Sequence, residues 1–263
     1  MGFKDGFIES GRFSIHFSER KISGSPNTLV LLHGMGTSSS TWVRTLPGID
    51  TSWNIFALDL PGFGLSSINS GPRFASMDEL HRSVVVFFEE KISRPCLLLG
   101  HSLGGWLAAR FASEYPENVK HLILVDNAGI LCEETLEQGK AFQVDSLGDL
   151  SRLLNKIWYR YPWYFRPFYP AVLNDLRKRN VANFVQSIHV GDFLNDRLHS
   201  LAMNTTVIWG KHDRLISMGA VEILKQSIPR AQVYIIDRCG HVPQLEQPKE
   251  LVNIIRKVLQ QQV

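Results

Sequence analysis

Cysteine is scarce in this sequence, and long apolar runs are missing from it. The three cysteines lie far apart, and no two of them have CxxC spacing. This usage is typical of a reducing compartment and excludes both a disulfide scaffold and a zinc site built from cysteine pairs. No stretch approaches the ~18 uninterrupted apolar residues of a membrane-spanning helix. The opening segment MGFKDGFIES lacks the apolar centre of a secretory signal, so the expected location is the cytoplasm.

The chain also lacks a strong charge of either sign. Its net charge of +3 comes from scattered Lys and Arg residues, and there is no basic stripe interleaved with aromatic residues. Nucleic acid is therefore not an expected partner. The histidines show no metal-ligand spacing, so no metal site is expected. A length of 263 residues with 44% hydrophobic content is enough for one large α/β domain.

Short apolar runs separated by helical patterns recur along the chain. The runs predict buried strands at Thr28–Leu32, Asn54–Leu58, Cys96–Leu99, His121–Val125, Thr205–Trp209 and Val233–Ile236, after an alternating strand at Phe13–Phe17. The helical patterns cover Met77–Ile92, which follows a capping box at Ser76, and also Trp106–Tyr115, Met218–Ser227 and Pro248–Gln261. This alternation predicts an α/β fold with a mostly parallel central sheet and helices on both faces.

The alternation is interrupted once. Residues 130–201 contain helical and aromatic segments but no convincing buried strand. Since so long a stretch rarely forms a bare loop inside a compact domain, we expect an inserted helical cap. The predicted core domain then consists of residues 1–129 and 202–263, and the predicted cap of residues 130–201.

Ser102 is the first candidate catalytic residue. It lies in the G-x-S-x-G pattern of Gly100–Gly104, directly after a predicted strand and directly before a predicted helix. Such a serine is raised on a sharp turn, and the N–H of Leu103 then faces any negative charge that develops beside it. A loose pentapeptide also occurs by chance, but the strand–turn–helix context favours a nucleophile. The neighbouring His101 is expected mainly to fill the turn.

A base and an acid for this serine follow later in the chain. Asp213 comes directly after one predicted strand, and His241 follows the next. Carboxyl ends of parallel strands meet at one edge of a sheet, so both side chains can converge on Ser102. His241 is expected to take the serine proton, with Asp213 orienting the imidazole. Asp126 also ends a strand and stays open as a rival acid, although the G-x-x-D turn favours Asp213.

The loop His33–Gly36 follows the predicted strand Thr28–Leu32. It can supply a second oxyanion donor, the backbone N–H of Met35, opposite that of Leu103. The alternative is an ordinary glycine-rich turn between a strand and a helix. With G-x-S-x-G in the same chain, we favour the oxyanion site.

Five short motifs occur in a fixed order along nearly the full length. They are LLHGMG (Leu31–Gly36), DLPGFGLS (Asp59–Ser66), GHSLGG (Gly100–Gly105), WGKHD (Trp209–Asp213) and CGHVPQLEQP (Cys239–Pro248). Together they resemble the α/β-hydrolase superfamily. The set is most similar to capped serine hydrolases: small carboxylesterases, monoacylglycerol-lipase-like enzymes and carbon–carbon bond hydrolases of aromatic degradation. The resemblance implies the α/β-hydrolase fold, ester cleavage through an acyl-enzyme and no cofactor.

The resemblance carries the catalytic roles onto Ser102, Asp213 and His241, and the oxyanion roles onto Met35 and Leu103. Differences from the sequence patterns of related enzyme families reduce the number of activities to expect. Haloalkane dehalogenases and epoxide hydrolases have Asp where this chain has a serine. The carbon–carbon hydrolases usually have Asn before the serine and Trp after the histidine, where this chain has His101 and Val242.

An aromatic segment in the predicted cap, Trp158–Tyr169, holds eight aromatic residues in twelve. It packs the cap, lines an apolar acyl pocket or rests on a membrane or micelle surface. Its prolines count against a continuous surface helix. Candidate substrate-binding residues are Gly34, Trp106, Trp158, Trp163 and Val242.

Three functions follow from these features. The first is a serine hydrolase that cleaves carboxylic esters of apolar or aromatic small molecules. The second is a carbon–carbon bond hydrolase of a meta-cleavage-type dienoate. The third is a ligand receptor on a hydrolase fold, in which slow turnover traps the ligand. The expected partner is a small-molecule ester, with transient lipid-surface contact, in a monomer or homodimer.

Overall fold

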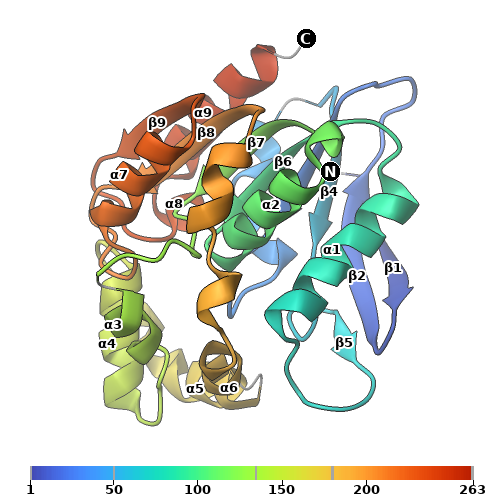
Figure 1. Ribbon diagram of the computed structural model, residues 1–263. Coiled ribbons are helices and arrows are strands. Elements are labelled where there is room, and N and C mark those ends of the chain that lie inside the picture. Colours follow the sequence, from blue (N-terminus) through green and yellow to red (C-terminus); the bar gives the residue numbers. More distant parts are fainter. Residues whose placement is uncertain (1, 50, 134, 179–180, 262–263) are drawn as a thin grey trace.

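The computed structural model describes residues 2–49, 51–133, 135–178 and 181–261, and these form a nine-stranded sheet covered by helices (Figure 1). The strands are β1 (Lys4–Ser10), β2 (Phe13–Arg20), β3 (Thr28–Leu32), β4 (Asn54–Leu58), β5 (Ser67–Ile68), β6 (Cys96–His101), β7 (Val119–Val125), β8 (Asn204–Gly210) and β9 (Ala231–Ile236). Their order in the sheet is β1-β2-β4-β3-β6-β7-β8-β9, and β5 pairs with β2.

The sheet is parallel from β4 to β9, and β1 and β2 add an antiparallel edge. From β3 the chain moves outward to β4, then crosses back to β6 on the other side of β3 and continues outward to β9. The direction of winding therefore reverses between β3 and β6. Loops at the carboxyl ends of these two neighbours form the crevice in which open α/β sheets bind ligands.

Helices cover both faces of the sheet. The longer ones of the core are α1 (Met77–Lys91), α2 (Leu103–Glu114), α7 (Met218–Ser227) and α9 (Pro248–Gln260), with α8 (Pro243–Glu246) before α9 and short 3₁₀ turns at η1 (Ser39–Trp42), η2 (Leu46–Gly48) and η3 (Pro116–Asn118). One apolar core lies between the sheet and α1, α2 and α7, and a second lies between the sheet and α9. The predicted α/β-hydrolase fold, with a mostly parallel sheet between helices, is confirmed.

The predicted elements of the core are found within three residues of their expected ends. The edge strand β1 was not expected, because its charged residues and Gly6 break the alternation of apolar positions. Helix α2 begins at Leu103 and not at Trp106. Gly104 and Gly105 are poor helix formers, so the sequence does not reveal the first turn of α2. The close packing there requires glycine, because a Cβ at Gly105 would lie 2.4 Å from the Asn127 side chain.

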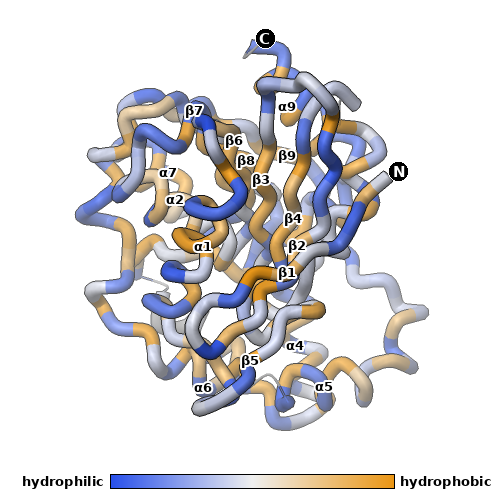
Figure 2. The backbone as a smooth tube through the Cα atoms, turned by 90° about the vertical axis from the view of Figure 1, so that its right-hand side faces the viewer, coloured by the Kyte–Doolittle hydropathy of each residue, from blue (hydrophilic) through white to orange (hydrophobic). Residues whose placement is uncertain are grey.

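The described part of residues 130–201 contains helices and no strand. These are α3 (Thr135–Lys140), α4 (Leu147–Ile157), η4 (Trp163–Phe168), α5 (Tyr169–Lys178), α6 (Val181–Gln186), η5 (Val190–Asp192) and η6 (Asn195–Ser200). Two views at right angles place α4, α5 and α6 together below the sheet (Figures 1 and 2). We call residues 130–201 the cap segment; their division from the core as a separate domain stays a prediction.

None of the helices in the described ranges combines the length and the apolar character needed to cross a bilayer.

Candidate active site

Ser102 lies at the junction of β6 and α2 in a strained backbone conformation. Its φ of 52° and ψ of −118° are rarely adopted by residues other than glycine. The turn is tight enough to require the flanking glycines. A Cβ at Gly100 would lie 2.2 Å from the carbonyl oxygen of Gly104, and one at Gly104 would lie 2.4 Å from that of Leu32. The sequence G-x-S-x-G therefore places a single serine hydroxyl above the crevice between β3 and β6.

His241 joins Ser102 to Asp213 through hydrogen bonds at both ring nitrogens. Its Nε2 lies 2.9 Å from the Ser102 hydroxyl oxygen, and its Nδ1 lies 2.7 Å from Oδ2 of Asp213. Because an ionised carboxylate only accepts, Nδ1 carries a proton. The lone pair of Nε2 is then directed at the serine hydroxyl. Residues 102, 213 and 241 thus form a hydrogen-bonded chain along which a proton could move, although they are far apart in the sequence.

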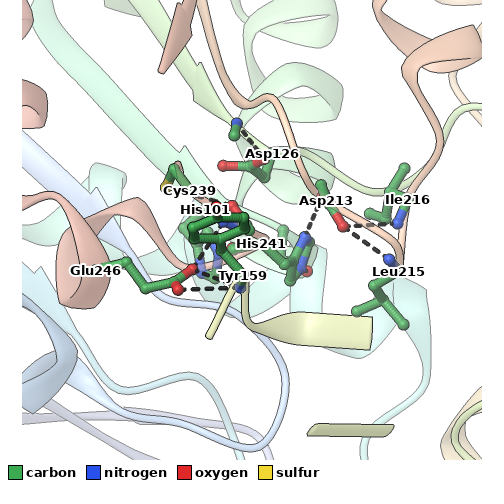
Figure 3. A network of polar contacts seen from close by, with 12 residues as sticks. His101, Asp126, Tyr159, Asp213, Leu215, Ile216, Cys239, His241 and Glu246 are labelled. Carbon is green, nitrogen blue, oxygen red and sulfur yellow. Dashed lines mark hydrogen bonds and ion pairs between the residues drawn. The ribbon is translucent and has the colours of Figure 1, made fainter. Parts of the chain in front are cut away.

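Asp213 is held in place by the backbone as well as by the histidine. Its Oδ1 accepts the N–H of Leu215 at 2.8 Å and that of Ile216 at 3.0 Å, and its side chain is fully buried (Figure 3). Both donors belong to the loop that follows β8. Three hydrogen bonds thus fix the orientation of this carboxyl group.

Asp126, the rival acid, is fully buried at the end of β7 and forms no hydrogen bond to His241. Its Oδ1 accepts the N–H of Gly210 at 2.9 Å, while Asp213 lies beside it (Figure 3). Burial first, and the adjacent Asp213 carboxylate second, raise the pKa of Asp126 well above its usual value. Ionising both of two buried neighbouring carboxyl groups costs much free energy. Asp213 accepts more hydrogen bonds than Asp126 does. Asp126 therefore holds a proton.

Asp126, Asp213 and His241 also form the one group within the described ranges whose geometry suits a metal ion, with ligand atoms within 4.8 Å of one another. The hydrogen bonds already in place use the atoms that such an ion would need. His241 Nδ1 is bonded to Asp213, and its Nε2 is bonded to Ser102. An ion at this place would have to break this hydrogen-bonded chain.

The loop after β3 packs directly against the serine turn. A Cβ at Gly34 would lie 2.7 Å from Nδ1 of His101 and 3.1 Å from Cβ of Ser102. Met35, the next residue, lines cavities that also contain Ser102. Leu103 is the first residue of α2, so its N–H has no acceptor within the helix. Both predicted oxyanion donors thus belong to segments that border the serine.

His101 has a more specific place than filling the turn. Its Nε2 donates to the carbonyl oxygen of His241 at 2.7 Å, and Gln244 lies 3.3 Å from its Nδ1. Burial lowers the pKa of His101 to about 3, so the ring is neutral. A neutral ring in this position fixes the loop that carries His241 without adding charge beside it.

Glu246 on α8 is a site residue that the sequence prediction missed. Its carboxylate accepts the N–H of Gly240 at 2.7 Å and that of Tyr159 at 3.0 Å (Figure 3). The N–H of His241 in turn donates to the carbonyl of Ile157 at 2.6 Å. Glu246 therefore ties the His241 loop to the cap segment. Its motif was visible in the sequence, but nothing local distinguishes it from a solvated helix residue.

Two cavities meet at Ser102, and both are covered by the cap segment. The larger has a volume of about 370 Å³ and the smaller about 270 Å³. His241, Val242 and Leu153 line the larger one, and Leu103 and Phe184 line the smaller one. Both are lined mainly by apolar side chains. A molecule bound across Ser102 would therefore have one part in each cavity.

The predicted substrate-binding residues fall into two groups. Trp158 and Val242 line the larger cavity, and Trp106 lines the smaller one. Gly34 and Trp163 are among the lining residues of neither. The backbone of Gly34 packs against the side chains of His101 and Ser102. Trp163 is 76% exposed, because the chain turns outward at Pro162 and carries the tryptophan to the surface.

Comparison with known proteins gives a consistent result. Residues 29–254 match the alpha/beta hydrolase family. Lipase 3 of Moraxella sp. is 27% identical over 259 residues, which cover 94% of this chain and 81% of the lipase. The 2-hydroxy-6-oxononadienedioate/2-hydroxy-6-oxononatrienedioate hydrolase of Cupriavidus pinatubonensis is 30% identical over 275 residues, covering 96% and 91%. The crystal structure of a bacterial membrane phospholipase A has a TM-score of 0.84 at 27% identity, over 98% of this chain and 86% of that one.

Proposed function

The chain belongs to the alpha/beta hydrolase family and is a hydrolase of that family, and from this premise we propose that it is a serine hydrolase that cleaves carboxylic esters with an apolar acyl group. The observation that carries the proposal is the 2.9 Å contact between the Ser102 hydroxyl and His241 Nε2, with Asp213 at the far side of the ring. This arrangement activates a serine for attack on a carbonyl carbon. The names of the lipase and phospholipase relatives support an ester as the substrate.

The first half of the reaction forms an acyl-enzyme. Ser102 Oγ attacks the ester carbonyl carbon while its proton moves to His241 Nε2. The carbonyl electron pair moves to oxygen, where the N–H groups of Met35 and Leu103 stabilise it. The C–O bond to the alcohol then breaks, and His241 gives its proton to the departing oxygen. Asp213 stabilises the imidazolium between these transfers.

The second half returns the free enzyme. A water molecule loses a proton to His241 Nε2 and attacks the acyl carbon. The resulting tetrahedral intermediate uses the same oxyanion donors, Met35 and Leu103. When it collapses, the bond to Ser102 Oγ breaks and the proton on His241 returns to the serine. The carboxylic acid leaves, and no electrons are exchanged with any cofactor.

We assign the alcohol and acyl parts of the ester to the two cavities from the position of His241. The departing alcohol must lie within reach of Nε2, so it occupies the larger cavity, which His241 lines. The acyl group then extends into the smaller cavity beside Leu103 and Trp106. Since a cavity of about 150 Å³ holds one benzene, a volume of 270 Å³ holds about ten carbon atoms. Acyl groups of up to about this size are the proposed substrates.

A carbon–carbon bond hydrolase is the second candidate. The relative from Cupriavidus pinatubonensis supports it, because it is 30% identical and is named as a hydrolase of 2-hydroxy-6-oxononadienedioate and 2-hydroxy-6-oxononatrienedioate. The same three residues would serve, since that reaction also needs a proton-transfer chain and an oxyanion site. His101 and Val242 stand where the pattern of such enzymes has Asn and Trp.

A paired assay separates the candidates. We expect the purified protein to hydrolyse p-nitrophenyl esters of short and medium acyl chains and to react with a fluorophosphonate probe at Ser102. Ser102→Ala should lose the labelling. Turnover of a 2-hydroxy-6-oxo-dienoate faster than of any ester would favour the second candidate. Failure of the probe to label an otherwise folded protein would contradict a serine nucleophile.

A further inference from the structure

A short turn at the surface of the cap segment is covered with aromatic side chains. We call Trp163–Phe168, which form η4, the aromatic turn. Its residues are exposed one after another, including Trp163 at 76%, Tyr164 and Phe168 at 59% each, and Phe165 at 44%. Monomeric proteins rarely expose apolar side chains contiguously, and such patches mark contacts with other molecules.

These rings form one patch, which borders the packed part of the cap segment where the Phe165 ring lies 6.3 Å from that of Tyr161. Neighbouring ring centroids lie 6.2 Å apart for Trp163 and Tyr164, 5.1 Å for Tyr164 and Phe165, and 6.1 Å for Phe165 and Phe168. None of the four belongs to either apolar core. The other exposed apolar side chains of the described residues include Val43 and Leu65, which line one hollow of the core, and Ile235 on β9.

The inner half of the same aromatic segment does pack inward. The Tyr161 ring lies 5.6 Å from that of Trp158 and 5.7 Å from that of Tyr169, and Trp158 lines the larger cavity. The aromatic segment therefore divides into a packed inner part and an exposed outer part. The outer part is free to contact a partner without unfolding the cap segment.

The part of the sequence that contains the aromatic turn is rich in positive charge. Between residues 150 and 180 the sequence has seven Lys or Arg residues and one acidic residue, Asp175. Because the whole chain carries only +3, the remainder is net negative. Arg160 and Arg166 flank or belong to the turn and are exposed. The Arg160 guanidinium lies over the Tyr159 ring, while its backbone N–H donates to Glu246. Positive charge beside exposed rings complements a surface of negative headgroups.

We propose that the aromatic turn docks this protein onto anionic phospholipid surfaces. Trp and Tyr rings settle at the level of lipid headgroups, Phe rings enter the acyl region, and arginines contact anionic headgroups. A stable protein partner needs about 800 Å² on each side, from some 20 residues or more. A turn of six residues is too small for that, whereas a few exposed side chains are enough to insert into a lipid surface.

Trp158 and Tyr159, which precede the aromatic turn in the chain, are bonded to Glu246 and to the loop that carries Asp213. Glu246 accepts the N–H of Tyr159, and Arg214 donates to the carbonyl oxygens of Trp158 and Tyr159. These residues join the turn to the wall of the larger cavity. Docking would bring that cavity to the surface from which an apolar ester leaves the lipid phase. This last consequence rests on the proposed function, while the docking itself does not.

Vesicle co-sedimentation tests the docking without any turnover. The full chain is mixed with phosphatidylcholine vesicles, with or without phosphatidylglycerol. We expect binding that rises with phosphatidylglycerol and weakens as salt is added. Trp163→Ser/Phe165→Ser/Phe168→Ser should lower partitioning by more than about tenfold. Arg160→Gln and Arg166→Gln should each lower it by up to about fivefold on anionic vesicles.

A triple variant with equally exposed side chains on the core is the matched control. Val43→Ser/Leu65→Ser/Ile235→Ser removes apolar area away from the cap segment and should bind vesicles as the wild type does. Thermal melting checks that each variant is folded. Wild-type protein that ignores anionic vesicles, or an aromatic variant that binds them unchanged, would overturn the proposal. Self-association that disappears in the aromatic variant, without vesicle binding, would assign the turn to a protein contact instead.

Discussion

On the core side of Ser102, hydrogen bonds hold each polar group in one position, whereas on the cap side the substrate meets mostly apolar side chains. His241 is bonded at both ring nitrogens and Asp213 has three donors. In the cap segment, Leu153 and Phe184 line the cavities. The difference separates two tasks. In the function that we propose, the core side determines how a bond is broken, and the cap side determines which molecule is held there.

The largest expected effects concern Asp213 and Asp126, the two buried acids on the core side. Asp213→Asn should lower kcat for ester hydrolysis by about 10⁴-fold, because the imidazole loses its tautomer and its counter-charge. Asp126→Asn should stay within about threefold of wild type, since an amide resembles the protonated acid that we assign there. Steady-state kinetics on one p-nitrophenyl ester measures both variants. A loss of about a thousandfold in Asp126→Asn alone would exchange the two roles.

Acid should destabilise the core through its buried neutral histidines. Burial lowers the pKa of His121 to about 4 and that of His101 to about 3, below the ~6.5 of an unfolded chain. Between pH 6.5 and 4 the unfolded state binds more protons, so the free energy of unfolding falls as pH falls. His121 alone should account for on the order of 3 kcal/mol.

Urea denaturation at several pH values measures this slope. His121→Gln removes one titrating group and should lower the slope between pH 6.5 and 4 by the share of His121, while His101 still contributes. The exposed His199 offers the matched control, since His199→Gln should leave the slope unchanged. Equal slopes in wild type and His121→Gln would contradict a buried neutral ring.

Substitutions on the cap side should change which ester is preferred. Phe184→Ala enlarges the smaller cavity, so kcat/KM for long relative to short acyl chains should rise by about tenfold. Leu153→Ala enlarges the larger cavity and should leave the acyl preference unchanged. A chain-length series of p-nitrophenyl esters compares the two. If Leu153→Ala moves the acyl optimum and Phe184→Ala does not, the two cavities have been assigned the wrong way round.

A small effect is expected for Glu246, which connects the His241 loop of the core to the cap segment. Glu246→Gln keeps an oxygen acceptor for Gly240 and Tyr159, while Glu246→Ala removes it. We expect kcat to fall by about tenfold in Glu246→Ala and by less in Glu246→Gln, since the residue positions His241 without touching substrate. A change in the pH profile of kcat would accompany a displaced histidine. Identical losses in both variants would indicate that the charge matters and the hydrogen bonds do not.

The same contrast explains what the sequence could predict. Ser102, Asp213 and His241 each follow an apolar run, and parallel strands bring their carboxyl ends to one edge, so local patterns were enough to bring these residues together. His101 and Glu246 act on residues far away in the chain, and no periodicity signals such contacts. The proton on Asp126 depends on a neighbour brought close only by the fold. The outward direction of Trp163 depends on where the chain turns at Pro162, which composition does not reveal.

The most direct test of the central claim is the rate of p-nitrophenyl hexanoate hydrolysis by Ser102→Ala beside wild type. The substitution removes one oxygen and leaves the His241–Asp213 pair intact. We predict a fall in kcat of about 10⁴-fold to 10⁶-fold with unchanged thermal melting, because the nucleophile is lost while the oxyanion site and the cavities remain. Hydrolysis at the wild-type rate by folded Ser102→Ala would contradict the account.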